Sequence, residues 1–151
     1  MIFHSTLAIA FAALVLTAQV SHAAGQTFFP NQDLAQFLVL KLDLATFRNA
    51  LGPRRTETRR TFAELGIAAT QAQPDAVVLE TEDWQFRLKV LRRTDINRDG
   101  LEDLALCFTE EARRGSYFAQ QALLVTRFSH SSYAVALKYE IEDCKSTTGQ
   151  R

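Results

Sequence analysis

The sequence predicts an α+β fold, in which an antiparallel β-meander packs against one or two N-terminal helices after a cleaved signal peptide. Three observations lead to this prediction. An apolar run opens the chain, an apolar stripe with helical spacing follows it, and four segments with alternating apolar and polar residues occupy the second half. Short connections between these segments favour antiparallel pairing of successive strands, with the helix covering one face of the sheet.

Residues 1–23 have the organisation of a signal peptide. Leu7 to Leu16 is an unbroken apolar run, and Ser21-His22-Ala23 places small residues at the two positions that signal peptidase reads. The run is shorter than the roughly 20 apolar residues that a membrane span needs. We therefore expect cleavage after Ala23, a periplasmic or secreted mature chain, and no membrane span within that chain.

Residues 24–151 are then a single α+β domain, long enough to bury a hydrophobic core. Lys and Arg together number 17, and so do Asp and Glu, so the formal net charge is zero. Because a nucleic-acid-binding domain normally carries a basic surface, this balance argues against nucleic acid as a partner. The expected partner is an unknown protein or a component of the cell envelope.

The segment 33–51 is expected to contain at least one helix. Its apolar stripe has the alternating three and four spacing of an amphipathic helix: Phe37, Leu40, Leu44, Phe47 and Leu51. Asn31 or Asp33 is a candidate N-cap, and Gly52-Pro53 ends the pattern. Every second residue from Leu38 to Leu44 is also leucine, which is a strand signal. One long helix, a helix then a strand, and a strand then a helix all remain open for residues 36–51.

The charged connector 54–60 is typical of a solvated loop or, alternatively, of an anion-binding patch, and residues 76–80 predict a short strand. The antiparallel sheet is expected within residues 84–142. Apolar and polar residues alternate over 84–90, 104–108 and 133–141, while 118–128 is apolar on both faces in places. Residues 129–132 lie between the last two strands as a turn.

Cys107 and Cys144 are the only cysteines, and an even count in an exported chain favours a disulfide between them. In the meander, the strand that holds Cys107 and the strand that ends before Cys144 run in the same direction, with one strand between them. The segment after the last strand would have to cross that gap. His130 is the only histidine of the predicted mature chain, so the cysteines are not expected to bind zinc.

The loop 95–103 carries the clearest chemical pattern in the sequence. Oxygen-bearing side chains stand at its positions 1, 3, 5 and 9, with glycine at position 6 to permit a sharp turn: Asp95, Asn97, Asp99, Asp103 and Gly100. Ca²⁺ takes six to eight oxygen ligands, and a loop with alternating oxygen side chains can wrap around the ion. The carbonyl of Leu101 would be a fifth protein ligand. Position 12 is Leu106 rather than glutamate, and strands flank the loop, so it is not an EF-hand.

This loop resembles the D-x-N-x-D-G-x-x-D calcium loops of FG-GAP and VCBS-type repeats, which also occur in integrin α-chain propellers. In that family the loop joins two antiparallel strands, and the residues that match the five ligands named above hold the ion. The resemblance implies a structural Ca²⁺ at the level of the loop alone, because a propeller needs several blades and this chain has one copy. The alternative is a metal-free Asx-rich hairpin turn whose acids are neutralised by Arg92, Arg93 and Arg98.

Two other polar clusters are weaker candidates for chemistry. Ser129-His130-Ser131-Ser132 brings hydroxyls close to an imidazole, but neighbours in a turn rarely have the orienting partner that a general base needs. Glu80, Glu82 and Asp83 would suit sugar hydrolysis as paired carboxylates, although acids beside a strand are more often solvated. We therefore expect no catalytic residues and a non-enzymatic calcium-binding module. The alternatives are a metal-free accessory or inhibitor-like protein and, third, a hydrolase that acts on the envelope.

Overall fold

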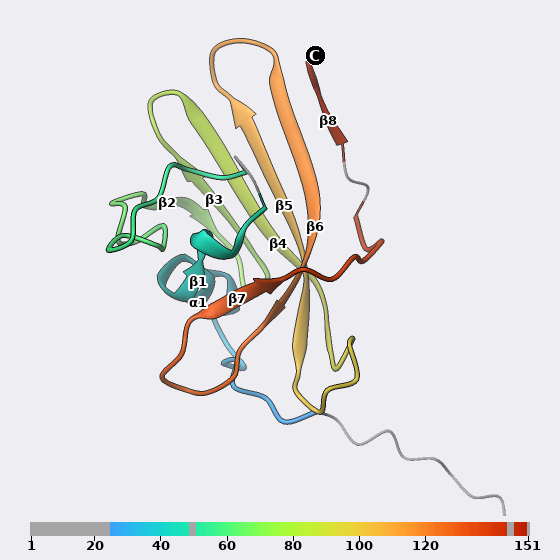
Figure 1. Cartoon of the computed structure of the whole chain (residues 1–151). Helices are drawn as coiled ribbons and strands as arrows, with labels where there is room; N and C mark the ends of the chain where they lie inside the picture. Colours follow the sequence, from blue (N-terminus) through green and yellow to red (C-terminus); the bar gives the residue numbers. More distant parts are fainter. Residues whose placement is uncertain (1–24, 49–50, 145–146, 151) are drawn as a thin grey trace, which may run out of the picture.

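A curled mixed sheet with one α-helix makes up the computed structural model of the chain, in which residues 25–48, 51–144 and 147–150 are described (Figure 1). The elements are α1 (Leu34–Lys41), β1 (Leu42–Asp43), the 3₁₀ turn η1 (Leu44–Thr46), β2 (Ala69–Ala72), β3 (Ala76–Glu80), β4 (Trp84–Thr94), β5 (Asp103–Ala112), β6 (Tyr117–Thr126), β7 (Ala134–Leu137) and β8 (Thr147–Gln150). The predicted signal peptide, residues 1–23, lies outside the described residues. No helix in the described part of the chain is long and apolar enough to cross a membrane.

The strands follow the order β1-β7-β6-β5-β4-β3-β2, and β8 pairs with β6 on the edge that β7 also uses. Strands β2 to β7 are antiparallel to their sequence neighbours, so the predicted meander is confirmed and extended by β2 and β3. The expectation of a purely antiparallel sheet was wrong at one edge. There β1 pairs with β7 in parallel, through Leu42 with Ala134 and Asp43 with Val135.

The segment 33–51 holds a helix followed by a strand, one of the three arrangements left open by the sequence. Helix α1 buries Leu34, Ala35, Leu38 and Val39, whereas Leu40 is half exposed, so the expected stripe from Phe37 to Leu51 does not form one helical face. Asp33 does occupy the N-cap position, but its side chain makes no capping hydrogen bond. The helix stops early because Leu42 and Asp43 take extended conformations and pair with β7.

The core lies between the helix-bearing segment and one face of the long strands. On β4 and β5 every second side chain is buried against it, as the alternation predicted: Phe86, Leu88, Val90, Leu104, Leu106 and Phe108. From the other side come Leu38 of α1 and Phe62 of the connection between η1 and β2, both fully buried. Each such side chain contributes about 1.5–3 kcal/mol by leaving water, so this apolar layer is the main source of stability.

Candidate functional site

The loop 95–103 joins β4 to β5 at the end of the sheet opposite the β5–β6 hairpin (Figure 1). Thr94 pairs with Asp103 across the two strands. Because Asp95 follows Thr94, the register of the sheet brings the first and last predicted ligands, Asp95 and Asp103, near each other. Gly100 has a φ of +88°, which confirms that the sharp turn needs a glycine at this position. Arg98 also has a positive φ, of 65°, without that freedom.

The polar side chains of the loop point back at its own backbone. Asp95 accepts hydrogen bonds from the N–H groups of Asp99 at 3.1 Å and Gly100 at 2.9 Å. Asn97 Oδ1 accepts from Asp99 N at 3.0 Å, and Asp99 Oδ1 accepts from Leu101 N at 2.9 Å. The contacts of Asn97 and Asp99 are Asx turns, and together with those of Asp95 they hold the loop in a tight curl.

Asp103 differs from the other acids of the loop because it is fully buried. Its Oδ2 accepts hydrogen bonds from the backbone N–H groups of Ile96 at 3.0 Å and Asn97 at 3.3 Å, so the carboxylate is directed into the loop. Its Oδ1 has no hydrogen-bond partner among the described residues. Burial raises the pKa of Asp103, against the lowering effect of the two backbone donors. A further positive partner would stabilise the ionised form of this carboxylate.

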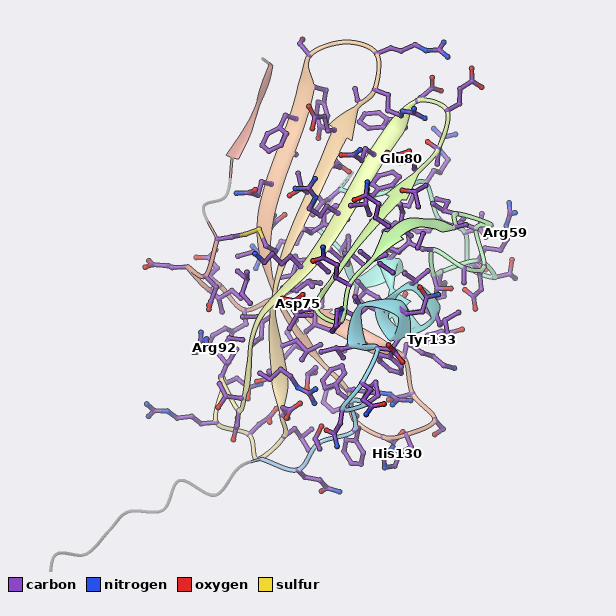
Figure 2. The ribbon with its side chains drawn as sticks, turned by 180° about the vertical axis from the view of Figure 1, so that it is seen from behind. Arg59, Asp75, Glu80, Arg92, His130 and Tyr133 are labelled. Atoms are coloured by element: carbon purple, nitrogen blue, oxygen red, sulfur yellow. A yellow bond between two sulfur atoms is a disulfide. The ribbon has the colours of Figure 1, made fainter. Side chains whose placement is uncertain are left out.

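The arginines expected to neutralise these acids mostly bind elsewhere. Arg92 forms a two-pronged ion pair with Asp143, at 2.9 and 2.8 Å, and its place beside the loop can be seen in Figure 2. Arg93 donates to Glu102 and to the carbonyl of Pro30, while Arg98 is exposed. None of the ion pairs in the described part of the chain involves a predicted calcium ligand.

The N-terminal segment packs directly on the predicted metal loop. Gln26 and Leu101 form a parallel bridge, in which Gln26 N donates to Gly100 O at 2.8 Å and Gln26 O accepts from Glu102 N at 2.9 Å. Gly25 lies so close that an added Cβ would stand 2.8 Å from the carbonyl carbon of Leu101. The carbonyl expected to bind calcium is therefore held between the loop and the first described residues of the chain.

The five predicted ligands thus share one loop, but their carboxylates are not arranged as a ready-made cage. Among the residues that the structure describes, no three acidic, histidine or cysteine side chains converge closely enough to form a metal site. Ion binding would require the carboxylates of Asp95 and Asp99 to turn from backbone donors toward a shared centre. A carboxylate oxygen has more than one acceptor position, so part of the present hydrogen bonding can persist in a bound state.

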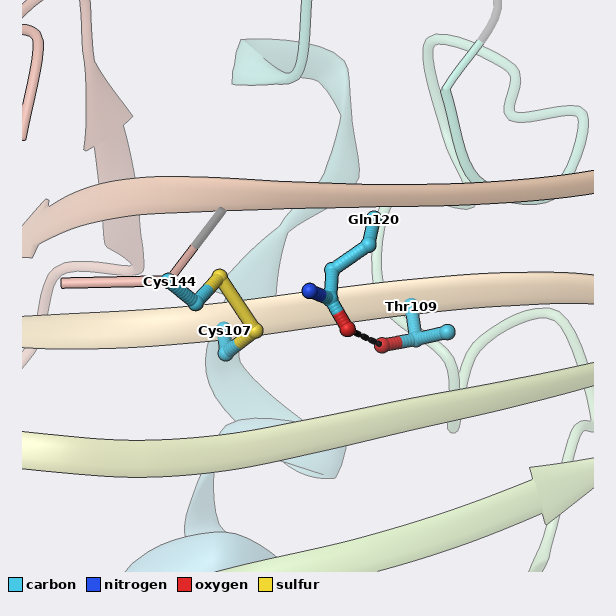
Figure 3. The surroundings of a disulfide bond; sticks show 4 residues. All are labelled: Cys107, Thr109, Gln120 and Cys144. Atoms are coloured by element: carbon cyan, nitrogen blue, oxygen red, sulfur yellow. Dashed lines mark hydrogen bonds between the residues drawn. A yellow bond between two sulfur atoms is a disulfide. The ribbon is translucent and has the colours of Figure 1, made fainter. Parts of the chain in front are cut away.

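A disulfide joins Cys107 on β5 to Cys144 beyond β7, with their Cα atoms 5.8 Å apart (Figure 3). The pairing agrees with the prediction, and so does the route, because β6 separates β5 from β7 and the segment after β7 must pass β6 to reach Cys107. Cys107 pairs with Ala122 of β6 and Lys89 of β4 across the sheet. The disulfide therefore fastens the segment after β7 to the middle of the sheet.

The two weaker candidates for catalysis occupy structural positions at opposite ends of the sheet, where Figure 2 labels Glu80 and His130. The turn's serines bond to one another, and the His130 ring makes an edge contact with Phe28 at 5.2 Å. Glu80 accepts from Gln85, and Glu82 pairs with Arg114 in an exposed ion pair. Neither cluster combines a nucleophile with an oriented base.

The charged connector 54–60 is partly structural. Arg60 forms an ion pair with the buried Asp43 and lies over the ring of Tyr133, which Figure 2 shows beside the helix. Arg55 donates to the carbonyls of Leu51 at 2.8 Å and Phe47. Arg55 and Arg60 thus attach the connector to the domain, while residues 54 and 56–59 are exposed, as expected for a solvated loop.

Sequence reasoning missed a cavity at the other end of the sheet, centred on Glu110. Glu110 is the next core-facing residue of β5 after Leu104, Leu106 and Phe108, and it is only 4% exposed. A glutamate in the apolar register of a strand was therefore a readable signal. Its surroundings come from segments far apart in the sequence and had no such signal.

Comparison with known proteins adds no relative to this picture. No protein-family model matches the chain, and neither the curated proteins nor the solved structures contain a significant match.

Proposed function

We propose that this chain is exported to the periplasm or secreted, and that it is a non-enzymatic binding or accessory module stabilised by Ca²⁺ in the loop 95–103. The observation that carries the calcium proposal is the buried Asp103. One oxygen of its carboxylate has no hydrogen-bond partner among the described residues, and the other accepts from the backbone of the loop. Leaving a charge buried without compensation is costly, and a divalent cation within the loop would supply that compensation.

The proposed ligands are the side chains of Asp95, Asn97, Asp99 and Asp103 and the carbonyl of Leu101. Three carboxylates around one point repel one another, and Ca²⁺ removes that repulsion while accepting an irregular set of oxygens. The ion would link the ends of β4 and β5 to the N-terminal segment, because Leu101 contacts Gly25 and Gln26. The proposed role of the ion is structural, because it would hold these segments together.

The proposal of export rests on the signal-peptide pattern of residues 1–23 and on the disulfide, which is typical of oxidising compartments. Expression of the full chain in a bacterial host should give an exported protein that begins at Ala24 or Gly25. Intact-mass measurement of the protein in the periplasmic fraction checks this. A full-length species retained in the membrane would contradict it.

Calcium should stabilise the mature protein, because the ion binds the folded state and hardly the unfolded one. With a Kd of about 10⁻⁴ to 10⁻³ M, as in extracellular loops, calcium at about ten times Kd adds about 1.4 kcal/mol. This corresponds to a rise of roughly 3–7 °C in melting temperature. Magnesium should raise the melting temperature less, because it demands tight octahedral geometry. Thermal melts in chelator, calcium and magnesium give the comparison.

Asp99→Ala should abolish the calcium response and leave a folded, less stable protein. Asp99→Asn is the sharper variant, because its amide oxygen can still accept from Leu101 N while the charge is lost. Glu102→Gln is the matched control. Glu102 lies in the same loop but binds Arg93 and Thr27 rather than pointing inward, so its loss should leave the calcium response intact. An unchanged wild-type melting temperature from chelator to saturating calcium would reject the proposal.

A metal-free accessory or inhibitor-like protein is the second candidate, because the loop is already closed by hydrogen bonds from its own backbone. The hydroxyl of Thr126 lies near Asp103 and favours its ionised form, so a small movement would give the carboxylate a donor. This candidate predicts no calcium response in the wild type. It also predicts that Asp99→Ala loses the same stability with and without calcium.

A further inference from the structure

A cavity of about 600 Å³ opens at the end of the sheet away from the calcium loop. It lies between the ends of β4, β5 and β6 and the segment that follows residue 50, and it is lined by Gly52, Pro53, Arg54, Thr81, Trp84, Phe86, Glu110 and Tyr117. Its volume is within the range of small-molecule sites. Three of the eight lining residues are aromatic, and one, Glu110, carries a carboxylate.

Glu110 carries the negative charge of this cavity. Its Oε1 accepts a hydrogen bond from the hydroxyl of Tyr117 at 2.7 Å, and its Oε2 accepts from the backbone N–H of Gly52 at 2.6 Å. The bond to this carboxylate raises the pKa of Tyr117 to about 12. In the described part of the chain, Glu110 belongs to no ion pair. Two neutral donors hold the buried carboxylate in place and leave its charge without a counter-ion.

The aromatic wall provides the second half of a cation site. Trp84 and Tyr117 both line the cavity and meet edge to face, with ring centroids 5.4 Å apart and ring planes nearly at right angles. Phe86 stacks on Phe108 at 6.3 Å, so the floor is continuous with the core. The faces of such rings carry partial negative charge and attract cations, most strongly the large, weakly hydrated organic ones.

We propose that this cavity binds an organic ammonium ion, with Glu110 as its counter-charge and Trp84 and Tyr117 as its aromatic wall. A small inorganic cation would leave the apolar walls unused, and a neutral ligand would leave the charge of Glu110 unbalanced. Arg54 also lines the cavity, but its side chain is exposed, so water screens its repulsion of the ligand. The proposal goes beyond calcium binding and does not depend on it, because the loop lies at the other end of the sheet (Figure 1).

Trp84 is the only tryptophan in the sequence, so its fluorescence reports directly on the cavity. We would titrate the mature protein in chelator with benzylammonium chloride and, in parallel, with benzyl alcohol, which has the same ring and no charge. Benzylammonium should change the fluorescence saturably and bind about tenfold more tightly than the alcohol, a difference of about 1.4 kcal/mol. Because chelator removes calcium, this result is independent of the loop.

Glu110→Gln should remove that preference, because the amide keeps an acceptor for Gly52 N but loses the charge. Glu111→Gln is the matched control: it is the next residue of β5, its side chain is on the opposite face of the strand, and it lines a different depression. The Glu111→Gln variant should keep the wild-type preference for benzylammonium over benzyl alcohol. If Glu110→Gln does not fold, the comparison of the two ligands on the wild type decides. Equal binding of both ligands, tighter binding of benzyl alcohol, or no saturable change would each overturn the proposal.

Discussion

Arg127 is a buried cation on which three parts of the chain converge. Only 5% exposed, it donates to the carbonyls of Phe28 at 2.5 Å and Ser132 at 3.0 Å, and also to that of His130. Its guanidinium lies 4.8 Å from the centroid of the Phe37 ring. Burial lowers the pKa of Arg127, but an arginine stays charged at any ordinary pH. One side chain thus joins the N-terminal segment, α1 and the β6–β7 turn.

We expect Arg127→Lys to destabilise the domain by about 1–3 kcal/mol, because an ammonium group cannot reach three separated carbonyls and leaves buried acceptors unpaired. Urea unfolding of the mature protein measures this loss. Arg59→Lys is the control, since Arg59 is exposed on the connector (Figure 2) and its replacement should change the free energy of unfolding by less than about 0.5 kcal/mol. Equal stability of the two variants would show that Arg127 does not act as this clamp.

At the scale of an element, the first described residues form an added edge to the loop 95–103. The position of this segment depends on the bridge between Gln26 and Leu101 and on the contact of Thr27 with Glu102. A side chain at position 25 has no room, because the carbonyl carbon and oxygen of Leu101 and the Cβ of Asp95 all lie within 3.1 Å of an added Cβ. Glycine is needed here for close approach.

Gly25→Ala should therefore push the segment off the loop. Overpacking of this kind costs about 1–3 kcal/mol, and the amides of Gln26 and Glu102 should lose their protection from hydrogen exchange. Comparison with Gly115→Ala separates the effect of contact from that of backbone strain, since position 115 has a positive φ but open space around it. Wild-type protection of both amides in Gly25→Ala would show that the segment is not docked in solution.

At the scale of the whole molecule, the disulfide links β5 to the segment after β7, across the intervening strand β6. The bridged residues are 37 apart in sequence, and the loop that they close contains β6, β7 and their turn. β7 has only four residues and β1 only two, so this edge of the sheet has few hydrogen bonds of its own. The covalent link compensates by restricting the unfolded chain.

Replacing both cysteines with serine should lower the free energy of unfolding by about 3–4 kcal/mol, the chain-entropy value for a loop of this length. Denaturant unfolding of the double variant measures the loss, and reduction of the wild type should reproduce it. Exported protein that is denatured without reductant should show no alkylatable thiol. Two modified cysteines under those conditions would contradict the bridge.

The alternating pattern of the second half predicted the central strands well, because each exposes one face to a single core and a period of two is visible locally. Thus Trp84 to Val90 and Leu104 to Phe108 lie in β4 and β5 as expected. The segment 36–51 was ambiguous because its local pattern fits two structures. The leucines from Leu38 to Leu44 fit the period of a strand and that of a helix, and the pairing of Leu42 and Asp43 with the distant β7 decides between them.

The sequence by itself determined the meander, the pairing of Cys107 with Cys144 and the candidate calcium loop, since each is a short-range pattern or follows from strand order. Tertiary structure alone decided which carboxylates are buried. Asp103 belongs to the loop pattern and Glu110 to the apolar register of β5, yet neither pattern shows how far the side chain is removed from water. Burial depends on segments remote in sequence, here β6 and the chain around Gly52, and no local pattern predicts that these segments pack against the two carboxylates.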